Sequence, residues 1–426
     1  MLALAPLPWL GDLRAEFWSY LALMLLSTVL LGVGCWLGFR GRGGDLPIRH
    51  ILLVAGLLRL AMLPMMPSLS DDAYRYVWDG RLLLHGENPY HVTPTETAWR
   101  DELFQLQGYP TTHTIYPPAA QLLFAAAAAV GEFFGGAWQW SFLAWKLMVI
   151  AADLLAVYLL LRLLRVQGVP LVRGVMYAWH PLVVVELAGQ GHTDALWVLA
   201  IALGLWGFAS GGAGKGLPAV VVGGAARVFP LVVAPLWFRF LPRRQLLVAV
   251  ACAACGTLLF APFLDPVSVE NYVRVMLRFT NYYEFNGGAY QAVKWVFDEL
   301  HLQPSNRIAG GILLGVQLAA FGLLWLLPVA ERSVRSLAWR ILLLLSFQIV
   351  LPAKVHVWYF VAPLFLLPIT WGRGLRWGWW WLCAVAPLTY FAYSGLAVRE
   401  PTWLLAVEWG GFALLVLAEQ MRRQHR

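Results

Sequence analysis

Long apolar runs fill most of the 426-residue chain, and short polar connectors separate them. A helix needs about 20 apolar residues to span the hydrocarbon core of a bilayer. The pattern predicts membrane-type helices over 18–38, 47–66, 118–135, 141–164, 171–189, 194–210, 213–241, 245–264, 308–329, 337–352, 356–371, 376–394 and 402–420. Two long polar stretches, 67–117 and 265–307, interrupt the series, and we expect both to be loops outside the bilayer.

Composition supports a membrane protein. Hydrophobic residues make up 60% of the chain and charged residues only 13%, whereas soluble domains average about 45–50% and about 25%. A soluble enzyme, a disordered protein and a disulfide scaffold are therefore excluded, and we predict an all-α polytopic membrane protein. The Cys252-x-x-Cys255 pair lies in an apolar run without a second pair, so helix packing is its expected role.

The net charge of +8 comes from arginines in short connectors. The positive-inside rule places such connectors in the cytoplasm, so we expect no nucleic-acid partner. Loop 67–117 holds seven acids against three arginines and belongs outside. If every apolar run crosses the membrane once, the arginines of 162–173 lie outside, against the rule. They lie inside if 118–135 is a surface helix of the outer loop. The remaining crossings then fit if 213–241 is two short helices that meet near Arg227–Pro230, where proline breaks a helix.

This threading gives about 13 transmembrane helices, an N-terminus outside and a C-terminus inside. We divide the chain into an extra N-terminal helix with its linker (1–46), a catalytic module (47–264) with outer loop 67–140, a second outer loop (265–307) and a C-terminal module (308–426). The expected location is the plasma (inner) membrane, with the site on its extracytoplasmic side.

Candidate chemistry begins just after helix 47–66 with Asp71 and Asp72. Carboxylates at a membrane interface are candidates for proton transfer. The alternative is that one of them caps the helix predicted over 72–84. His192 and Asp194 lie between two later helices on the same predicted side, and here too Thr193 or Asp194 could be a helix cap.

Cations are expected on this side as well. Arg227 lies at the predicted helix break, and Lys354 and His356 precede an aromatic pair. A cation at a broken membrane helix suits a phosphate group, although Arg227 could instead extend to the interface. Arg59, inside an apolar helix, either lines the cavity or pairs with an acid.

Aromatic, amide and carboxylate residues gather at 281–290, around Asn286. They suit the faces and hydroxyls of a sugar, but also an interfacial aromatic belt. The glycines at 211–216 lack the spacing of a nucleotide loop. We therefore expect no nucleotide-driven chemistry.

Three blocks resemble membrane glycosyltransferases of the GT-C fold, especially bacterial mannosyltransferase-like proteins that use polyprenyl-phosphate sugars. They are Ser70–Arg81 (SDDAYRYVWDGR), Gly86–Tyr90 (GENPY) and Thr114–Pro118 (TIYPP). Weaker matches surround His192, Arg227 and His356. The resemblance implies a GT-C fold with surface helices in the first outer loop. The family's D-x-D would need an acid where this chain has Ala73, so whether Asp71 or Asp72 is the base stays open.

The resemblance further implies transfer of a hexose, mannose by default, from a polyprenyl-phosphate donor to a glycolipid or glycan acceptor, by one inverting displacement with an aspartate base. No cofactor is certain, and a divalent metal held by Asp71, Asp72 and Asp194 stays open. A lipid-linked-sugar flippase or solute transporter is the alternative function. Candidate substrate-binding residues are Arg75, Asp79, Tyr116, His192, Asp194, Arg227, Asn286, Lys354 and His356.

Overall fold

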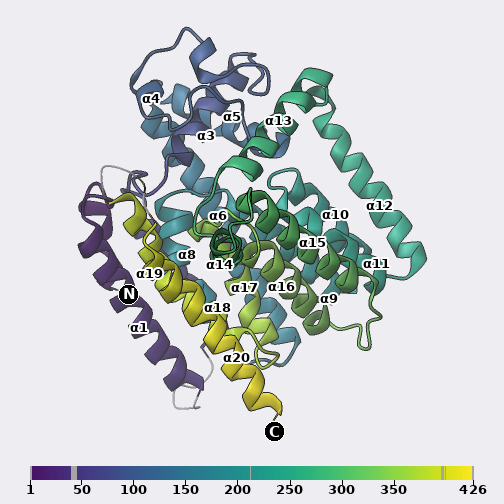
Figure 1. Cartoon of the computed structure of the whole chain (residues 1–426). Helices are drawn as coiled ribbons and strands as arrows, with labels where there is room; N and C mark the ends of the chain where they lie inside the picture. Colours follow the sequence, from purple (N-terminus) through teal and green to yellow (C-terminus); the bar gives the residue numbers. More distant parts are fainter. Residues whose placement is uncertain (1, 40–45, 212, 395–397, 399, 425–426) are drawn as a thin grey trace.

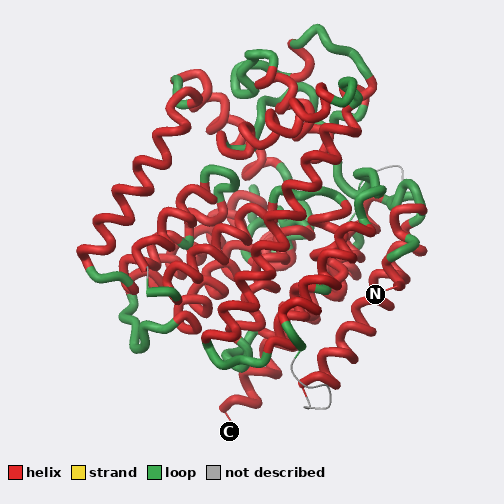
Figure 2. The backbone as a smooth tube through the Cα atoms, turned by 180° about the vertical axis from the view of Figure 1, so that it is seen from behind, coloured by secondary structure: helices red, strands yellow, loops and turns green. Residues whose placement is uncertain are grey.

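The computed structural model describes residues 2–39, 46–211, 213–394, 398 and 400–424. Over these ranges the protein is helical (Figure 2), and the only strand-like pairing is a pair of isolated bridges from Phe285 and Asn286 to Lys354. The predicted all-α class is confirmed. In the first half the α-helices are α1 (Phe17–Phe39), α2 (Ile48–Ala61), α3 (Asp72–Leu84), α4 (Glu102–Gln105), α5 (Pro118–Phe133), α6 (Trp138–Val166), α7 (Val175–Ala178), α8 (Pro181–Val183), α9 (Asp194–Ala209) and α10 (Ala213–Gly224).

The second half continues in the same way, with short helical turns between several of the elements. Its α-helices are α11 (Trp237–Phe240), α12 (Arg243–Thr257), α13 (Pro266–Tyr282), α14 (Gly288–Glu299), α15 (Ser305–Leu326), α16 (Val334–Val350), α17 (Val361–Thr370), α18 (Arg376–Val385), α19 (Thr402–Leu405) and α20 (Gly411–Gln424). Helices α3, α4 and α5 gather at one end of the molecule, and α20 ends at the opposite end (Figure 1).

Several helices have the length and composition of membrane spans. Among the described residues there are four, Phe17–Gly38, Trp138–Val166, Ser305–Leu326 and Thr402–Gln424. A fifth is possible if Leu171–Ala178 and Pro181–Gly189, which meet at 48°, form one span. Other apolar helices are shorter. The protein is thus a helical membrane protein, while the count of about 13 crossings stays a prediction.

The break expected in 213–241 is confirmed. Helix α10 ends at Gly224, and the next helical turn begins only at Phe229. Arg227 lies in this break, which leaves its side chain free to turn toward neighbouring elements. Helix α5, predicted to lie at the surface as part of the first outer loop, packs along α3 and α6.

The stretch 265–307, expected as a loop, is largely helical. Helix α13 begins where Asp265 accepts hydrogen bonds from the N–H groups of Val267 and Ser268, both at 3.0 Å. Hydrogen bonds from the Ser268 hydroxyl and from the Ser268 N–H group lower the pKa of Asp265. Ser268 and Asn271 are buried, whereas Val267, Val273 and Leu277 of the same helix are exposed. An outward apolar face is typical of a helix lying at a membrane interface. Because the other face of such a helix is polar, its sequence resembles that of a loop, which explains the incorrect prediction.

A buried ion pair connects α2 with α6. The Arg59 Nε atom lies 2.6 Å from an Asp153 carboxylate oxygen, and both side chains are inaccessible to solvent. Tyr177 donates to the other Asp153 oxygen at 2.6 Å, and Arg59 also donates to the Ala178 carbonyl. Of the two roles left open for Arg59, pairing with an acid is the one observed.

Candidate active site

The two adjacent aspartates at the start of α3 point in different directions. The Asp71 carboxylate lies 2.9 Å from Arg14, a residue that precedes α1. An Asp72 oxygen faces His192, 3.9 Å from its Nδ1 atom, and about a third of the Asp72 side chain remains exposed. Asp71 is the N-cap residue, yet its carboxylate accepts no hydrogen bond from the helix. Asp71 thus occupies the predicted N-cap position without a side-chain capping hydrogen bond, and Asp72 is the aspartate directed at the other candidate residues.

His192 lies between two carboxylates. Its Nε2 atom is 3.3 Å from Glu186, on the side opposite to Asp72, and both Glu186 oxygens accept from the Tyr390 hydroxyl at 3.0 Å. Within the described chain neither imidazole nitrogen has a hydrogen bond of good geometry. Burial lowers the pKa of His192 to about 4, against the opposing influence of Asp72 and Asp194. This shift favours the uncharged imidazole, which can form hydrogen bonds without adding charge to the site.

The loop that carries His192 is fixed from below. Gly191 has a φ of +76°, and its carbonyl accepts from the Trp145 indole at 2.6 Å. A Cβ atom at Gly191 would approach the Phe142 ring to 3.0 Å, so glycine is required here for both reasons. The side-chain oxygen of Gln190 accepts from the backbone N–H groups of Ser68 and Leu69, both at 3.0 Å. This ties the loop to the segment that leads into Asp72.

Arg227 turns inward from the break in 213–241. It donates to the Thr193 hydroxyl at 2.8 Å, and its other terminal nitrogen lies 3.4 Å from Asp194. Its guanidinium is 5.4 Å from the ring centres of both Phe229 and Tyr359. Only 12% of the side chain is exposed. The alternative that Arg227 extends to the interface is therefore wrong.

Lys354 and His356 approach the same place from the segment between α16 and α17. The Lys354 ammonium lies 4.4 Å from the centre of the Phe279 ring, and no described carboxylate lies within 4.0 Å of it. Burial lowers its pKa to about 8; Asp72 opposes this shift and Arg227 adds to it. Trp358 stacks on both histidines, with ring centres 3.8 Å from His192 and 4.4 Å from His356.

Six of the predicted residues thus come together from four distant parts of the sequence. We call them the charged cluster: Asp72, His192, Asp194, Arg227, Lys354 and His356. The cluster combines a partly accessible carboxylate, two cations and a histidine that stacks on Trp358. This arrangement can accept a proton at one end and stabilise negative charge at the other.

Arg75 and Asp79 lie beside the cluster in a supporting network. They form a 2.6 Å ion pair within α3. Arg75 also donates to the Thr112 carbonyl at 2.9 Å, and Gln121 donates to Asp79 at 3.2 Å. These contacts hold the first outer loop against α3 and α5. Tyr116 is buried with its ring centre 4.9 Å from that of Tyr76.

Asn286 is not brought into the cluster. Its side chain donates to Thr389 at 3.2 Å and accepts from the Trp409 indole at 2.8 Å. Both contacts lie in the C-terminal helices, and the residue has a φ of +50°. The structure thus gives Asn286 a positioning role: it orients the segment that pairs with the backbone around Lys354.

Sequence reasoning assigned no role to Glu186, Trp358 or Arg14. Of these three residues, Glu186 could have been identified from the sequence, because a single carboxylate inside an apolar run indicates a functional site. For a metal, no group of three or more His, Cys, Asp or Glu side chains in the described chain is arranged to hold one. Asp71, one of the ligands considered, is turned toward Arg14.

Together, the fold and the charged cluster define a helical membrane protein with ionisable groups gathered at one end. Residues 3–241 match the model of the MptA_B family, described as alpha-(1->6)-mannopyranosyltransferase, N-terminal domain. The match covers more than half of the chain, so the chain belongs to this mannosyltransferase family and is a glycosyltransferase. The matched span includes α1, which the sequence analysis set apart as an extra helix. No curated protein matches the chain.

Proposed function

We propose that the protein transfers mannose from a polyprenyl-phosphate donor to a hydroxyl group of a glycolipid or glycan at the extracytoplasmic face of the plasma membrane. The observation that carries this proposal is that the Asp72 carboxylate and the cations Arg227 and Lys354 lie in one cluster, in a chain of a mannosyltransferase family. Transfer from a sugar phosphate needs a base for the acceptor and cations for the leaving group.

Asp72 is the proposed base. It is partly accessible and has no arginine or lysine partner within 4.0 Å in the described chain, whereas Asp71 is already paired with Arg14. A free carboxylate can approach an acceptor hydroxyl and remove its proton as the oxygen attacks. His192, fixed between Asp72 and Glu186, orients the carboxylate or takes the proton onward.

Arg227 and Lys354 are the proposed phosphate ligands. In the described chain the Lys354 ammonium has aromatic contacts but no ion pair, so its charge is available to a ligand. Arg227 is held rigidly by Thr193 and Asp194. Fixed cations aimed at the point where charge grows stabilise the transition state without reorganisation, and arginine suits phosphate oxygens geometrically.

The bond changes balance in one step. The acceptor oxygen forms a bond to the anomeric carbon and gives its proton to Asp72, while the carbon–oxygen bond to phosphate breaks and polyprenyl phosphate leaves with the electron pair. A single displacement inverts the anomeric centre. The alpha linkage in the family's description then requires a beta-linked donor.

The test uses the full chain in lipid nanodiscs, synthetic beta-linked polyprenyl-phosphate mannose and a mannose-containing glycolipid. We expect mass spectrometry to show free polyprenyl phosphate and an acceptor heavier by one hexose, with an alpha linkage by nuclear magnetic resonance. Arg227→Gln should abolish the product, and Arg278→Gln, an exposed arginine on α13, should not. An untouched donor that changes leaflet would instead support a flippase.

A further inference from the structure

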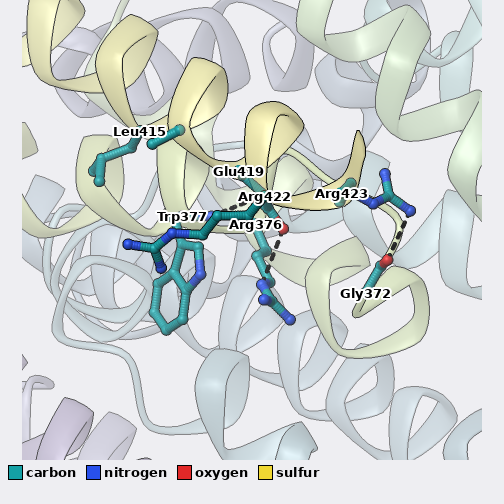
Figure 3. Close-up of a pocket in the computed structure, with 8 residues that line it drawn as sticks. Gly372, Arg376, Trp377, Leu415, Glu419, Arg422 and Arg423 are labelled. Atoms are coloured by element: carbon teal, nitrogen blue, oxygen red, sulfur yellow. Dashed lines mark hydrogen bonds and ion pairs between the residues drawn. The ribbon is translucent and has the colours of Figure 1, made fainter. Parts of the chain in front are cut away.

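A second charged region lies at the end of the molecule opposite to α3. A cavity of about 470 Å³ opens between the turn before α18 and the last turns of α20. Figure 3 shows Arg376, Arg422 and Arg423 around it, together with Trp377 and Glu419. Its volume falls within the roughly 300–1,000 Å³ typical of ligand sites. Neither the charged cluster nor the proposed reaction uses this cavity.

The cavity carries excess positive charge. Among the described residues, Arg376 is the one of its three arginines with a carboxylate partner, and its Nε atom lies 3.0 Å from Glu419. Arg423 instead donates to the carbonyl of Gly372 at 2.9 Å and to that of Arg373. Carbonyls orient a guanidinium but do not neutralise it. In the described part of the chain, no carboxylate lies within 4.0 Å of Arg422 or Arg423.

Tryptophans lie at the same level as these arginines. The Arg376 guanidinium is 4.9 Å from the centre of the Trp371 ring and 5.3 Å from that of Trp377, and 41% of Trp377 is exposed. Tryptophan concentrates at the boundary between hydrocarbon and headgroups. The apolar span Thr402–Gln424 ends here too. The cavity therefore lies where lipid phosphates would be found.

The distribution of charge indicates which leaflet supplies the lipid phosphates. Arg335, which donates to the Trp371 carbonyl, and Arg373 add to the basic character of this end. By the positive-inside rule it faces the cytoplasm, where the leaflet is rich in anionic lipid. Arginines held in fixed orientations in a cavity bind the oxygens of a phosphate group more strongly than those of a neutral group.

We propose that this cavity binds the phosphate headgroup of an anionic phospholipid from the cytoplasmic leaflet. The phosphodiester accepts hydrogen bonds from Arg422 and Arg423, and the acyl chains lie along the exposed apolar surface of α20, which includes Leu414 and Leu417. The site does not depend on the proposed transferase activity.

The test measures lipid retention by native mass spectrometry on the purified full chain. The probes are phosphatidylglycerol, phosphatidylcholine and inorganic phosphate, each titrated separately. We expect phosphatidylglycerol to bind more tightly than phosphatidylcholine, and inorganic phosphate to bind far more weakly. The double variant Arg422→Gln/Arg423→Gln should weaken phosphatidylglycerol binding roughly 30-fold, as expected for removing two arginines near a charged headgroup.

The matched control is Arg243→Gln/Arg244→Gln, which removes two adjacent exposed arginines at the start of α12, outside the cavity. It should change binding less than threefold if the cavity, and not overall charge, binds the lipid. Equal losses in both double variants would overturn the proposal. Phosphate binding as tight as that of phosphatidylglycerol would overturn the assignment to lipid.

Discussion

The two aspartates at the start of α3 provide a stringent test, because they are adjacent in sequence and differ in surroundings. Replacing Asp72 with asparagine removes the proposed base but keeps its shape. Loss of a general base costs about 10²–10⁴-fold in rate, or about 3–5 kcal/mol of transition-state stabilisation. Asp71→Asn loses only a partly exposed ion pair with Arg14. Such pairs contribute about 0–1 kcal/mol to stability. Even if all of that energy acted on the transition state, its loss would lower the rate by at most about fivefold.

The assay is the initial rate of mannose transfer in nanodiscs at saturating donor, with thermal unfolding measured on each variant. We expect Asp72→Asn to lose at least a hundredfold in kcat with an unchanged unfolding temperature. Asp71→Asn should stay within about fivefold of the parent chain. A kcat for Asp72→Asn within tenfold of the parent, or a greater loss in Asp71→Asn, would refute Asp72 as the base.

Three further predictions concern groups around and below the charged cluster. Because the pKa of Lys354 is lowered to about 8, its ammonium loses charge as pH rises through 8, so kcat/KM for the donor should fall there. Lys354→Arg should keep its charge and show no such fall in a pH–rate profile. Glu186→Gln should lower kcat roughly ten- to hundredfold, because the carboxyl group beside the His192 Nε2 atom is replaced by an amide that cannot exchange a proton with the ring; a change in KM alone would contradict this role. Arg59→Met should destabilise the fold by about 3–5 kcal/mol in denaturant unfolding because Asp153 is left buried and unpaired, and Arg59→Met/Asp153→Leu should recover most of that loss.

The lengths of the apolar runs and the positions of the prolines were enough to predict most of the fold. Runs of apolar residues locate the helices because each must bury its backbone polar groups within itself inside a bilayer. The break at Arg227 follows from Pro230 in the same way, since proline cannot continue a helix. The number of crossings is harder, because many of these helices are shorter than a bilayer is thick.

Amphipathic helices and long-range contacts could not be predicted in this way. Helix α13 buries Ser268 and Asn271 against the first outer loop. Polar residues at these positions made the segment resemble a loop in the sequence, because their buried partners are far away along the chain. Asn286 lies among aromatics and amides that suit a sugar, yet its side chain contacts Thr389 and Trp409. Nothing near Asn286 in sequence identifies those partners.

The first-loop blocks that carry the family resemblance serve two physical purposes. Asp72 alone among their acids belongs to the charged cluster, while the Arg75–Asp79 pair connects α3 to the Thr112 carbonyl. In the N-P-Y block, Asn88 donates to Ser268 of α13 at 3.0 Å, and the Tyr90 hydroxyl donates to the Tyr116 carbonyl at 2.7 Å.

These polar contacts fix the loop from several sides, as the placement of the proposed base Asp72 requires. A base displaced by about 1 Å can lose about a hundredfold in rate, so orientation of the loop matters as much as the carboxylate. Most of the sequence signature therefore encodes the placement of one side chain. Substitutions at Asn88 or Arg75 should therefore lower kcat in the nanodisc assay by displacing the proposed base Asp72. They should leave unchanged the KM for the donor, to which the proposed phosphate ligands Arg227 and Lys354 contribute.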